Sequence, residues 1–373
     1  MNYFSLAKKE PYRLFFPVGI IYLLWGALVW LPQIWNPGDY PVLAHRYLML
    51  NGFVSSFIAG FLMTAVPKFS KSFGARLFEI LPFFLITMLG VFFSYQNQEQ
   101  LVSVISSCQA LIILFFLFTR IFKRQENPPY SFIFIFVGLI LWLVAAMSGI
   151  FVDSEVMERV HYEGAIAAII LGVGSRLIPG ILGHVEIVSA QRKMYERPVS
   201  LLATVPPIFF LLIFSFVLSY LAPDQWGSLV RAIVVMTIGM KYWLLWKAPK
   251  EQTTFTWSLW LAGWLFMMSF VLRASWQEGS IHAGHSFFIT GIVLFCLLIG
   301  TRVLQSHGPK VKALENSKIL YGVSLLIILS AATRVTAVLV PEQYFKHLGF
   351  SALLLVCAVI LWSFKYLRYV RTS

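Results

Sequence analysis

Long apolar runs alternate with short polar segments along almost the whole chain. Each run covers 19 to 23 residues, the length an α-helix needs to cross the hydrocarbon core of a bilayer. The pattern predicts an all-α polytopic membrane protein with about twelve transmembrane helices in a single transmembrane domain, residues 1–373. The predicted spans are residues 14–34, 45–67, 77–95, 101–122, 130–152, 160–182, 200–222, 228–246, 255–275, 282–304, 319–340 and 347–367.

One apolar run carries a histidine at each end, His285 and His307. They are 22 residues apart, roughly 33 Å along a helix, so they mark opposite membrane faces and cannot share one metal. Two other runs begin in the same way, at His45 and His161. The three leading histidines are 116 and 124 residues apart and belong to spans 2, 6 and 10. This spacing suggests a repeat of four-helix units.

Composition supports the membrane assignment. Hydrophobic residues make up 59% of the chain and charged residues only 12%, against about 25% charged residues in soluble domains. The net charge of +13 could indicate a nucleic-acid partner, but Lys and Arg gather in every second connecting segment while Asp and Glu occupy the others. That alternation is typical of membrane orientation. It predicts a lipid bilayer as partner, no nucleic acid, and a multi-pass membrane protein with both termini in the cytoplasm.

The cysteines exclude two kinds of chemistry. Cys108, Cys296 and Cys357 all lie inside apolar runs, and the chain contains no CxxCH motif. We therefore expect no disulfide, and any haem is expected to be non-covalent, of the b type.

The histidines at the outer face are the candidate metal ligands. A single interfacial histidine is usually a tolerated surface residue, but three helices that begin with histidine favour a shared purpose. Imidazole is the commonest protein ligand for copper and for haem iron. We expect His45, His161 and His285 to bind metal, with His282 as a fourth candidate because it lies three residues before His285 on the same helix face.

Cationic side chains near the helix ends are candidates for binding a cofactor. Arg176 and Arg302 end apolar runs at the inner face, where they either extend to the lipid headgroups or pair with haem propionates. Arg334 lies near the outer end of span 11, where it could hold a propionate or a buried acid. His307 either serves an inner site or is an ordinary residue at the cytoplasmic end.

Two carboxylates have simpler expected roles. Glu163 follows His161 by two residues, and we expect it to be solvated. Glu79 lies in the first turn of span 3, three residues after Arg76, and we expect these two residues to form a structural ion pair.

Three stretches resemble the NnrS family of membrane proteins. HRYLMLNGFVSSFIAGFLMTAVPKFSKSFG, which starts at His45, is similar to the family motif HAHEMLFGF…AGFLLTAVPNWTG. GVGSRLIP, with Arg176, is similar to GGRIIPFF. The stretch from His285 to His307 is similar to HALTIGAMGLLTLAMMTRASLGH, with Arg302 in register. The final hairpin, with Arg334 and then LLLVCAVILWSFKYLRY, also resembles the end of the family. The resemblance therefore covers the whole chain, and the order of its elements is specific.

The resemblance implies haem, copper, and a role in nitric oxide metabolism or relief of nitrosative stress. The partners it implies are nitric oxide or a related small molecule and a membrane electron donor. One departure concerns copper: the family's second histidine and the acid after it are Tyr47 and Leu48 here. His282 or His347 could take the place of the missing ligand.

The residues leave several functions open. The leading one is a redox protein acting on nitric oxide or its adducts, or a protector that only binds nitric oxide; no catalytic residue is assigned. A twelve-helix transporter without redox metal is the alternative. A sensor or assembly factor without turnover is a third class. Visible absorption of the purified protein separates the first class from the other two.

Overall fold

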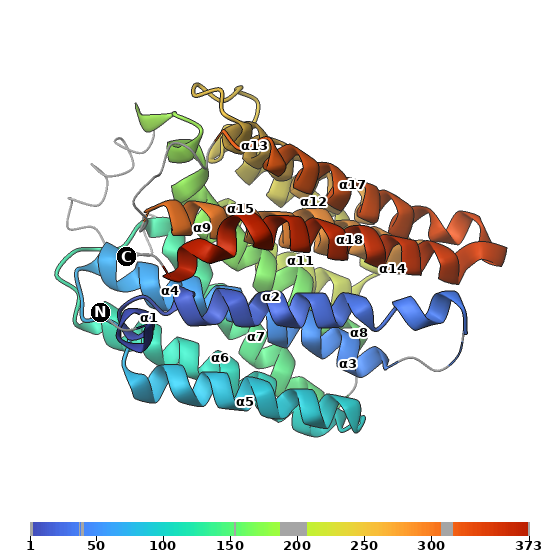
Figure 1. Ribbon diagram of the computed structural model, residues 1–373, viewed down its shortest axis with the longest axis horizontal. Coiled ribbons are helices and arrows are strands. Elements are labelled where there is room, and N and C mark those ends of the chain that lie inside the picture. The colour runs from blue at the N-terminus through green and yellow to red at the C-terminus, as the bar shows by residue number, and fades with distance from the viewer. Residues whose placement is uncertain are drawn as a thin grey trace. The chain divides into compact units, whose positions relative to one another are not determined.

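The computed structural model describes residues 3–36, 38, 41–152, 154–186, 207–306 and 316–371. These residues are helical almost throughout, and no β-strand occurs among them (Figure 1). In lipid, each apolar segment must satisfy its own backbone N–H and C=O groups, and a continuous helix does so. The predicted all-α class is confirmed for the described residues.

Ten helices in the described residues are long and apolar enough to cross a membrane, so the chain is a multi-pass membrane protein. The other two predicted spans overlap the shorter apolar helix Pro207–Leu221 and α12 (Asp224–Lys241), which has charged residues at both ends and Arg231 within it. The ten helices are Tyr12–Ile34, Val42–Ser70, Leu77–Tyr95, Glu99–Phe122, Tyr130–Phe151, Glu155–Ile181, Thr254–Ser275, Ser280–Ser306, Ile319–Leu339 and Pro341–Arg371.

The helices form two compact units, and the first contains Met1–Ala7, Tyr12–Phe61 and Gln252–Ser373. In this unit α17 and α18 lie side by side (Figure 1). α18 also packs on α2 and η1, and α13 packs on η7. The elements are α1 (Tyr3–Lys9), α2 (Tyr12–Leu28), η1 (Leu31–Ile34), α3 (Val42–Tyr47), η2 (Leu48–Val54), the start of α4 (Ser55–Ser70), α13 (Thr254–Ser275), α14 (Ser280–Ser286), η7 (Phe287–Val293), α15 (Leu294–Ser306), α17 (Ile319–Thr336), η8 (Ala337–Leu339), η9 (Pro341–Gln343), α18 (Tyr344–Tyr366) and η10 (Leu367–Arg371).

The second unit contains Lys8–Pro11 and Leu62–Glu251. α6 packs against both α5 and α7, α7 packs against η4 and α9, and α11 pairs with α12. Besides the end of α4 and α12, the elements are α5 (Leu77–Tyr95), α6 (Glu99–Phe122), η3 (Tyr130–Phe132), α7 (Ile133–Phe151), α8 (Glu155–Arg159), η4 (Val160–Ile166), α9 (Ala167–Ile181), η6 (Pro207–Phe209) and α11 (Phe210–Leu221).

A buried ion pair joins α5 to α6 within the second unit. The Glu79 and Arg120 side chains are 2% and 0% exposed, and the guanidinium donates to both carboxylate oxygens, with an Nη2–Oε2 distance of 2.7 Å. Arg120 Nη2 also donates to the Gly74 carbonyl at 2.8 Å. The predicted partner Arg76 is wrong: its backbone N–H, not its side chain, donates to Glu79 at 2.7 Å. Glu79 therefore caps its own helix while α6 balances its charge.

Three of the helices contain a π-helical segment, and these are the three helices that begin with the predicted histidines. The segments are η2, η4 and η7, each seven residues long. In each one the fifth residue is glycine, namely Gly52, Gly164 and Gly291. The fourth residue is polar and at most 5% exposed in each, namely Asn51, Glu163 and Thr290. This recurrence supports the predicted relation between spans 2, 6 and 10, and π-segments often occur at functional sites.

An aromatic ring packs against the glycine of each π-segment. A Cβ atom added at Gly52 would lie 2.8 Å from Tyr22, one at Gly164 3.0 Å from Phe216, and one at Gly291 3.2 Å from Phe266. All three distances are tighter than ordinary van der Waals contact. The glycines are therefore required for close helix packing in each unit.

Candidate functional site

His45 is held by the end of the helix that precedes it. Its Nδ1 lies 2.7 Å from the carbonyl oxygen of Gly26 in α2. A carbonyl oxygen only accepts hydrogen bonds, so Nδ1 carries the proton and the lone pair of the neutral ring is on Nε2. The indole Nε1 of Trp30 lies 3.1 Å from Nδ1 and 3.4 Å from Nε2. Because Nδ1 already donates to Gly26, the indole N–H could donate only to Nε2, at a distance beyond the usual 2.7–3.2 Å. Nε2 is therefore the nitrogen available to a metal.

His285 has the same arrangement in α14. Its Nδ1 lies 2.7 Å from the carbonyl oxygen of Ile281, so Nδ1 again donates and Nε2 again carries the lone pair. Metal-binding histidines commonly donate their other ring N–H to a carbonyl or carboxylate in this way. His45 and Arg334 both act electrostatically on His285, so His45 and His285, two of the three predicted ligands in the first unit, lie in one region.

His282 is engaged differently. Arg334 of α17 is 7% exposed, and its Nη1 lies 2.8 Å from Nδ1 of His282. Since a guanidinium only donates, Nδ1 of His282 is the acceptor and the proton of the neutral ring is on Nε2. The ring also stacks on Trp276, with centroids 6.3 Å apart, and meets Tyr344 edge-on at 6.0 Å. This arrangement favours a structural role for His282 over metal binding.

His347 is the fourth described histidine of the first unit. It lies in α18, one turn after Tyr344, and its Nδ1 is buried without a hydrogen-bond partner among the described residues. Like the other three, it lies near the N-terminal end of a membrane-spanning helix. The first unit therefore holds four histidines at equivalent helix ends, of which His45 and His285 share one tautomer.

His161 belongs to the second unit, in the π-segment η4. Its ring stacks on Trp142 of α7, with centroids 5.5 Å apart and an angle of 25° between the planes. The Trp142 indole donates to Ser106 Oγ at 2.8 Å. His161 lies three residues before its π-segment glycine, whereas His45 lies seven and His285 six residues before theirs. Along its own helix His161 is thus about 5 Å closer to that glycine.

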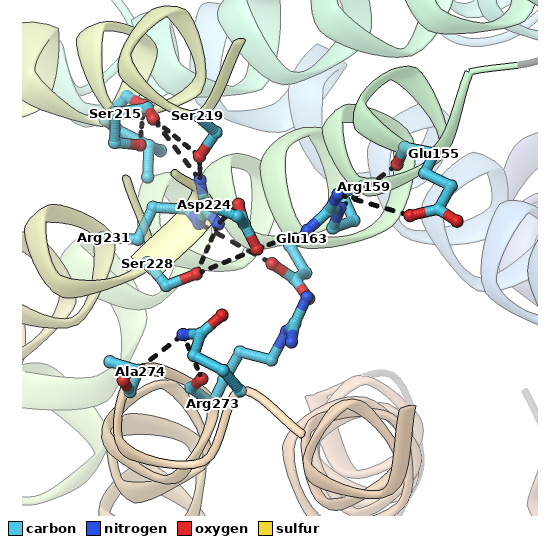
Figure 2. A network of polar contacts seen from close by, with 12 residues as sticks. Glu155, Arg159, Glu163, Ser215, Ser219, Asp224, Ser228, Arg231, Arg273 and Ala274 are labelled. Carbon is cyan, nitrogen blue, oxygen red and sulfur yellow. Dashed lines mark hydrogen bonds and ion pairs between the residues drawn. The ribbon is translucent and has the colours of Figure 1, made fainter. Parts of the chain in front are cut away.

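Arg159 and Glu163, each two residues from His161 in the sequence, belong to a network of charged residues in the second unit, and Figure 2 shows its side chains around Arg231. Arg231 of α12 is 1% exposed. Its guanidinium donates to Ser219 Oγ at 2.8 Å and to Ser228 Oγ at 2.9 Å. It also pairs with Asp224 at 3.2 Å and lies over the Phe216 ring. These contacts satisfy a charge that would otherwise be costly inside a membrane protein.

Glu163 is part of this network. Its Oε2 lies 3.6 Å from Nε of Arg231, and Asp224 is shared between Arg231 and Arg159. The predicted solvated position is wrong, because Glu163 is only 5% exposed. Its charge is balanced by Arg231 of another helix. Because Glu163 and Arg231 are far apart in the sequence, the sequence alone did not indicate this pair.

The arginines predicted to bind a cofactor are divided between the two units. Arg302 is half-buried in the C-terminal half of α15, and Arg334 is buried near the C-terminal end of α17; both belong to the first unit. Arg176 is half-buried in α9 of the second unit. His307 lies outside the described residues.

His184 follows α9 in the second unit and is 5% exposed. Burial lowers its pKa below the ordinary value, and the nearby Lys247 and Lys250 lower the pKa further. Its Nε2 has no hydrogen-bond partner among the described residues. His184 is not among the predicted metal ligands, and it therefore provides a control histidine.

Sequence reasoning missed the residues that orient the histidines. Gly26 acts through its backbone carbonyl, which no sequence motif displays. Trp30, Trp142 and Trp276 each come from the helix before a histidine or from the loop that follows that helix. The sequence does place a tryptophan before each histidine-led span, which could have indicated a ring that contacts the histidine. In a chain with 12 tryptophans, however, the same pattern also fits a belt of aromatic residues at the membrane interface.

Comparison with known proteins matches the chain to a family model. The family model described as NnrS protein matches residues 8–372, which is nearly the whole chain. No curated protein matches it. The match includes all three histidine-led helices and their π-segments.

Proposed function

Because the chain belongs to the NnrS family, we propose that it is a haem protein acting in nitric oxide metabolism or in the relief of nitrosative stress. The cofactor and this role come from the resemblance stated above. The proposed location, which the resemblance implies, is a bacterial inner membrane. The distribution of Lys and Arg supports an orientation with both termini in the cytoplasm. Its partners would be nitric oxide or a related small molecule and a membrane electron donor.

One observation carries the proposal of a bound haem. His45 and His285 belong to one unit, interact electrostatically, and each donate Nδ1–H to a backbone carbonyl at 2.7 Å. Both therefore keep an Nε2 lone pair for iron. Haem needs only one or two axial side chains, and these residues fit that requirement. His161 remains a proposed ligand from the second unit.

The chain's own residues would hold the rest of the cofactor. Arg334 and Arg302, both cations of the first unit, would pair with propionate groups, and Arg176 and His307 are proposed for the same purpose. The iron would supply a redox centre that binds nitrogen oxides or passes electrons to them. The histidines would fix the iron's position, and their carbonyl partners would keep Nε2 unprotonated.

Copper fits the described residues less well than haem does. Within the described ranges, no group of three or more His, Cys, Asp or Glu side chains could hold a metal ion. Tyr47 and Leu48 also replace two residues of the family motif. Copper therefore stays a proposal that elemental analysis of the purified protein tests.

The experiment is purification of the full chain in detergent from cells supplied with haem. We expect a Soret band and a haem that acid acetone extracts, because no CxxCH motif exists to hold it covalently. Addition of nitric oxide should then shift the band if the protein binds it. A colourless protein would contradict the proposal and favour the transporter.

A further inference from the structure

The direction of the His45 ring depends on two residues outside every recognised motif. We infer that Gly26 and Trp30 are positioning residues that turn Nε2 of His45 toward the metal. This inference rests on the proposed function for the metal itself. The orientation of the ring is a property of the protein and is tested separately below.

The end of α2 makes a backbone carbonyl available to His45. The last four carbonyls of a helix have no partner within it, and α2 ends at Leu28. The backbone N–H of Trp30 bonds to Ala27 at 3.2 Å, so it does not take the carbonyl of Gly26. That carbonyl accepts from His45 Nδ1 at 2.7 Å. The helix end thereby fixes which ring nitrogen carries the proton.

Gly26 must also lack a side chain. A Cβ atom at this position would lie 2.8 Å from Sδ and 3.1 Å from Cγ of Met49, and 3.3 Å from Cβ of Leu48. Met49 lies one turn after His45 on the same helix. The absence of a side chain at Gly26 therefore lets the histidine helix come close enough for the carbonyl bond.

Trp30 restrains the plane of the imidazole. Its ring meets His45 edge-on, with centroids 5.3 Å apart and an angle of 80°, and its Nε1 lies 3.1 Å from Nδ1 and 3.4 Å from Nε2. Tryptophan rings also contact His161 and His282, but there the two rings are stacked rather than edge-on. A tryptophan beside a histidine is thus a recurrent feature of the histidine-led helices.

The first test does not depend on the metal. Nitrogen NMR of haem-free, histidine-labelled protein reports which nitrogen of His45 is protonated, with the signal assigned by its loss in His45→Ala. We expect Nδ1–H in the wild type, a loss of that preference in Gly26→Ala, and its recovery in Gly26→Ala/Met49→Ala. Gly19→Ala is the matched control. Gly19 lies in α2 as Gly26 does, and its added Cβ would lie equally close, 2.8 Å, to a neighbouring side chain, but that neighbour is Phe57 and not a residue next to His45.

The second test uses the haem-loaded protein. Loss of such an outer partner usually costs 10–100-fold in metal affinity. We expect a loss of this size with a shifted Soret band in Gly26→Ala, and a smaller loss in Trp30→Phe, which keeps an aromatic ring but removes the N–H. Trp35→Phe, at an exposed residue, should match the wild type.

The two arms separate the possible failures. If the wild type binds no haem, the cofactor proposal fails, and NMR still decides whether Gly26 orients His45. If Gly26→Ala and Gly19→Ala leave the His45 tautomer equally unchanged, the positioning role of Gly26 is wrong. If Trp30→Phe and Trp35→Phe bind haem with the same affinity and spectrum, Trp30 has no positioning role.

Discussion

Arg334 donates from Nη1 to Nδ1 of His282 across 2.8 Å, and this bond distinguishes His282 from His45 and His285. His45 and His285 use Nδ1 as a donor to a carbonyl, whereas His282 uses it as an acceptor. The lone pair that a metal needs is thus on Nε2 in two rings and occupied by arginine in the third.

Because of this bond, we expect substitutions of His282 and His285 to change the haem content differently. His282→Asn keeps an acceptor for Arg334, so we expect near-normal haem content. His285→Asn removes an imidazole whose Nε2 carries the lone pair, so haem content should fall. Haem-to-protein ratios of the two purified variants decide between them. Equal losses in both variants would mean that His282 also binds the cofactor.

The buried pair of Glu79 and Arg120 should be essential for stability. Removing one partner leaves a buried charge uncompensated, which costs about 3–5 kcal/mol. We therefore expect Glu79→Gln to lower the thermal unfolding temperature markedly in detergent. The comparison is Glu126→Gln, which breaks a pair with exposed partners, Lys71 and Glu126, worth about 0–1 kcal/mol. Equal unfolding temperatures for the two variants would show that the buried pair contributes little.

The glycine of the first π-segment should not tolerate a larger residue. In Gly52→Ala the new Cβ would lie 2.8 Å from Cγ and 2.9 Å from Cβ of Tyr22, atoms that cannot swing away. We expect destabilisation of about 1–3 kcal/mol, read as a lower unfolding temperature. Gly322→Ala is the control, because its nearest neighbour would be Leu361 at 3.5 Å. The packing argument is contradicted if the two variants unfold alike.

Orientation in the membrane can be tested at two exposed positions, Glu278 and Lys123. In a variant without Cys108, Cys296 and Cys357, a cysteine at Glu278 should react with an impermeant reagent on intact cells. A cysteine at Lys123 should react only after the membrane is opened, because it lies in a basic, inner segment. The reverse pattern would overturn the predicted orientation and with it the outer location of the histidines.

The sequence predicted the helices well where hydropathy alone determines them. Residues 77–95 were predicted as a span and form Leu77–Tyr95, and residues 255–275 correspond to Thr254–Ser275. The span predicted at 228–246 is instead Asp224–Lys241. This helix begins at Asp224, directly after Pro223, because an acidic residue at a helix N-terminus is favoured by the helix dipole. A hydropathy average treats Asp224 only as a polar residue, so it places the start of the helix too late.

The histidine-led helices were found from the sequence, but the details of their chemistry were not. The π-segments depend on how each helix packs against an aromatic ring, and the apolar pattern around Gly52, Gly164 and Gly291 also fits an ordinary α-helix. The tautomers of His45 and His285 depend on backbone carbonyls that carry no sequence signature. The partners of Glu79 and Glu163 come from other helices. Sequence reasoning therefore assigned Glu79 the wrong partner, Arg76, and left Glu163 in solvent.

The central claim is that His45 and His285 hold the haem through Nε2. The most direct measurement is the haem-to-protein ratio, with the absorption spectrum, of purified His45→Ala, His285→Ala and His184→Ala beside the wild type. The account predicts that the first two variants lose haem or shift the Soret band, because a ligand is missing. His184→Ala should match the wild type. Full haem content with an unchanged spectrum in both His45→Ala and His285→Ala would contradict the claim.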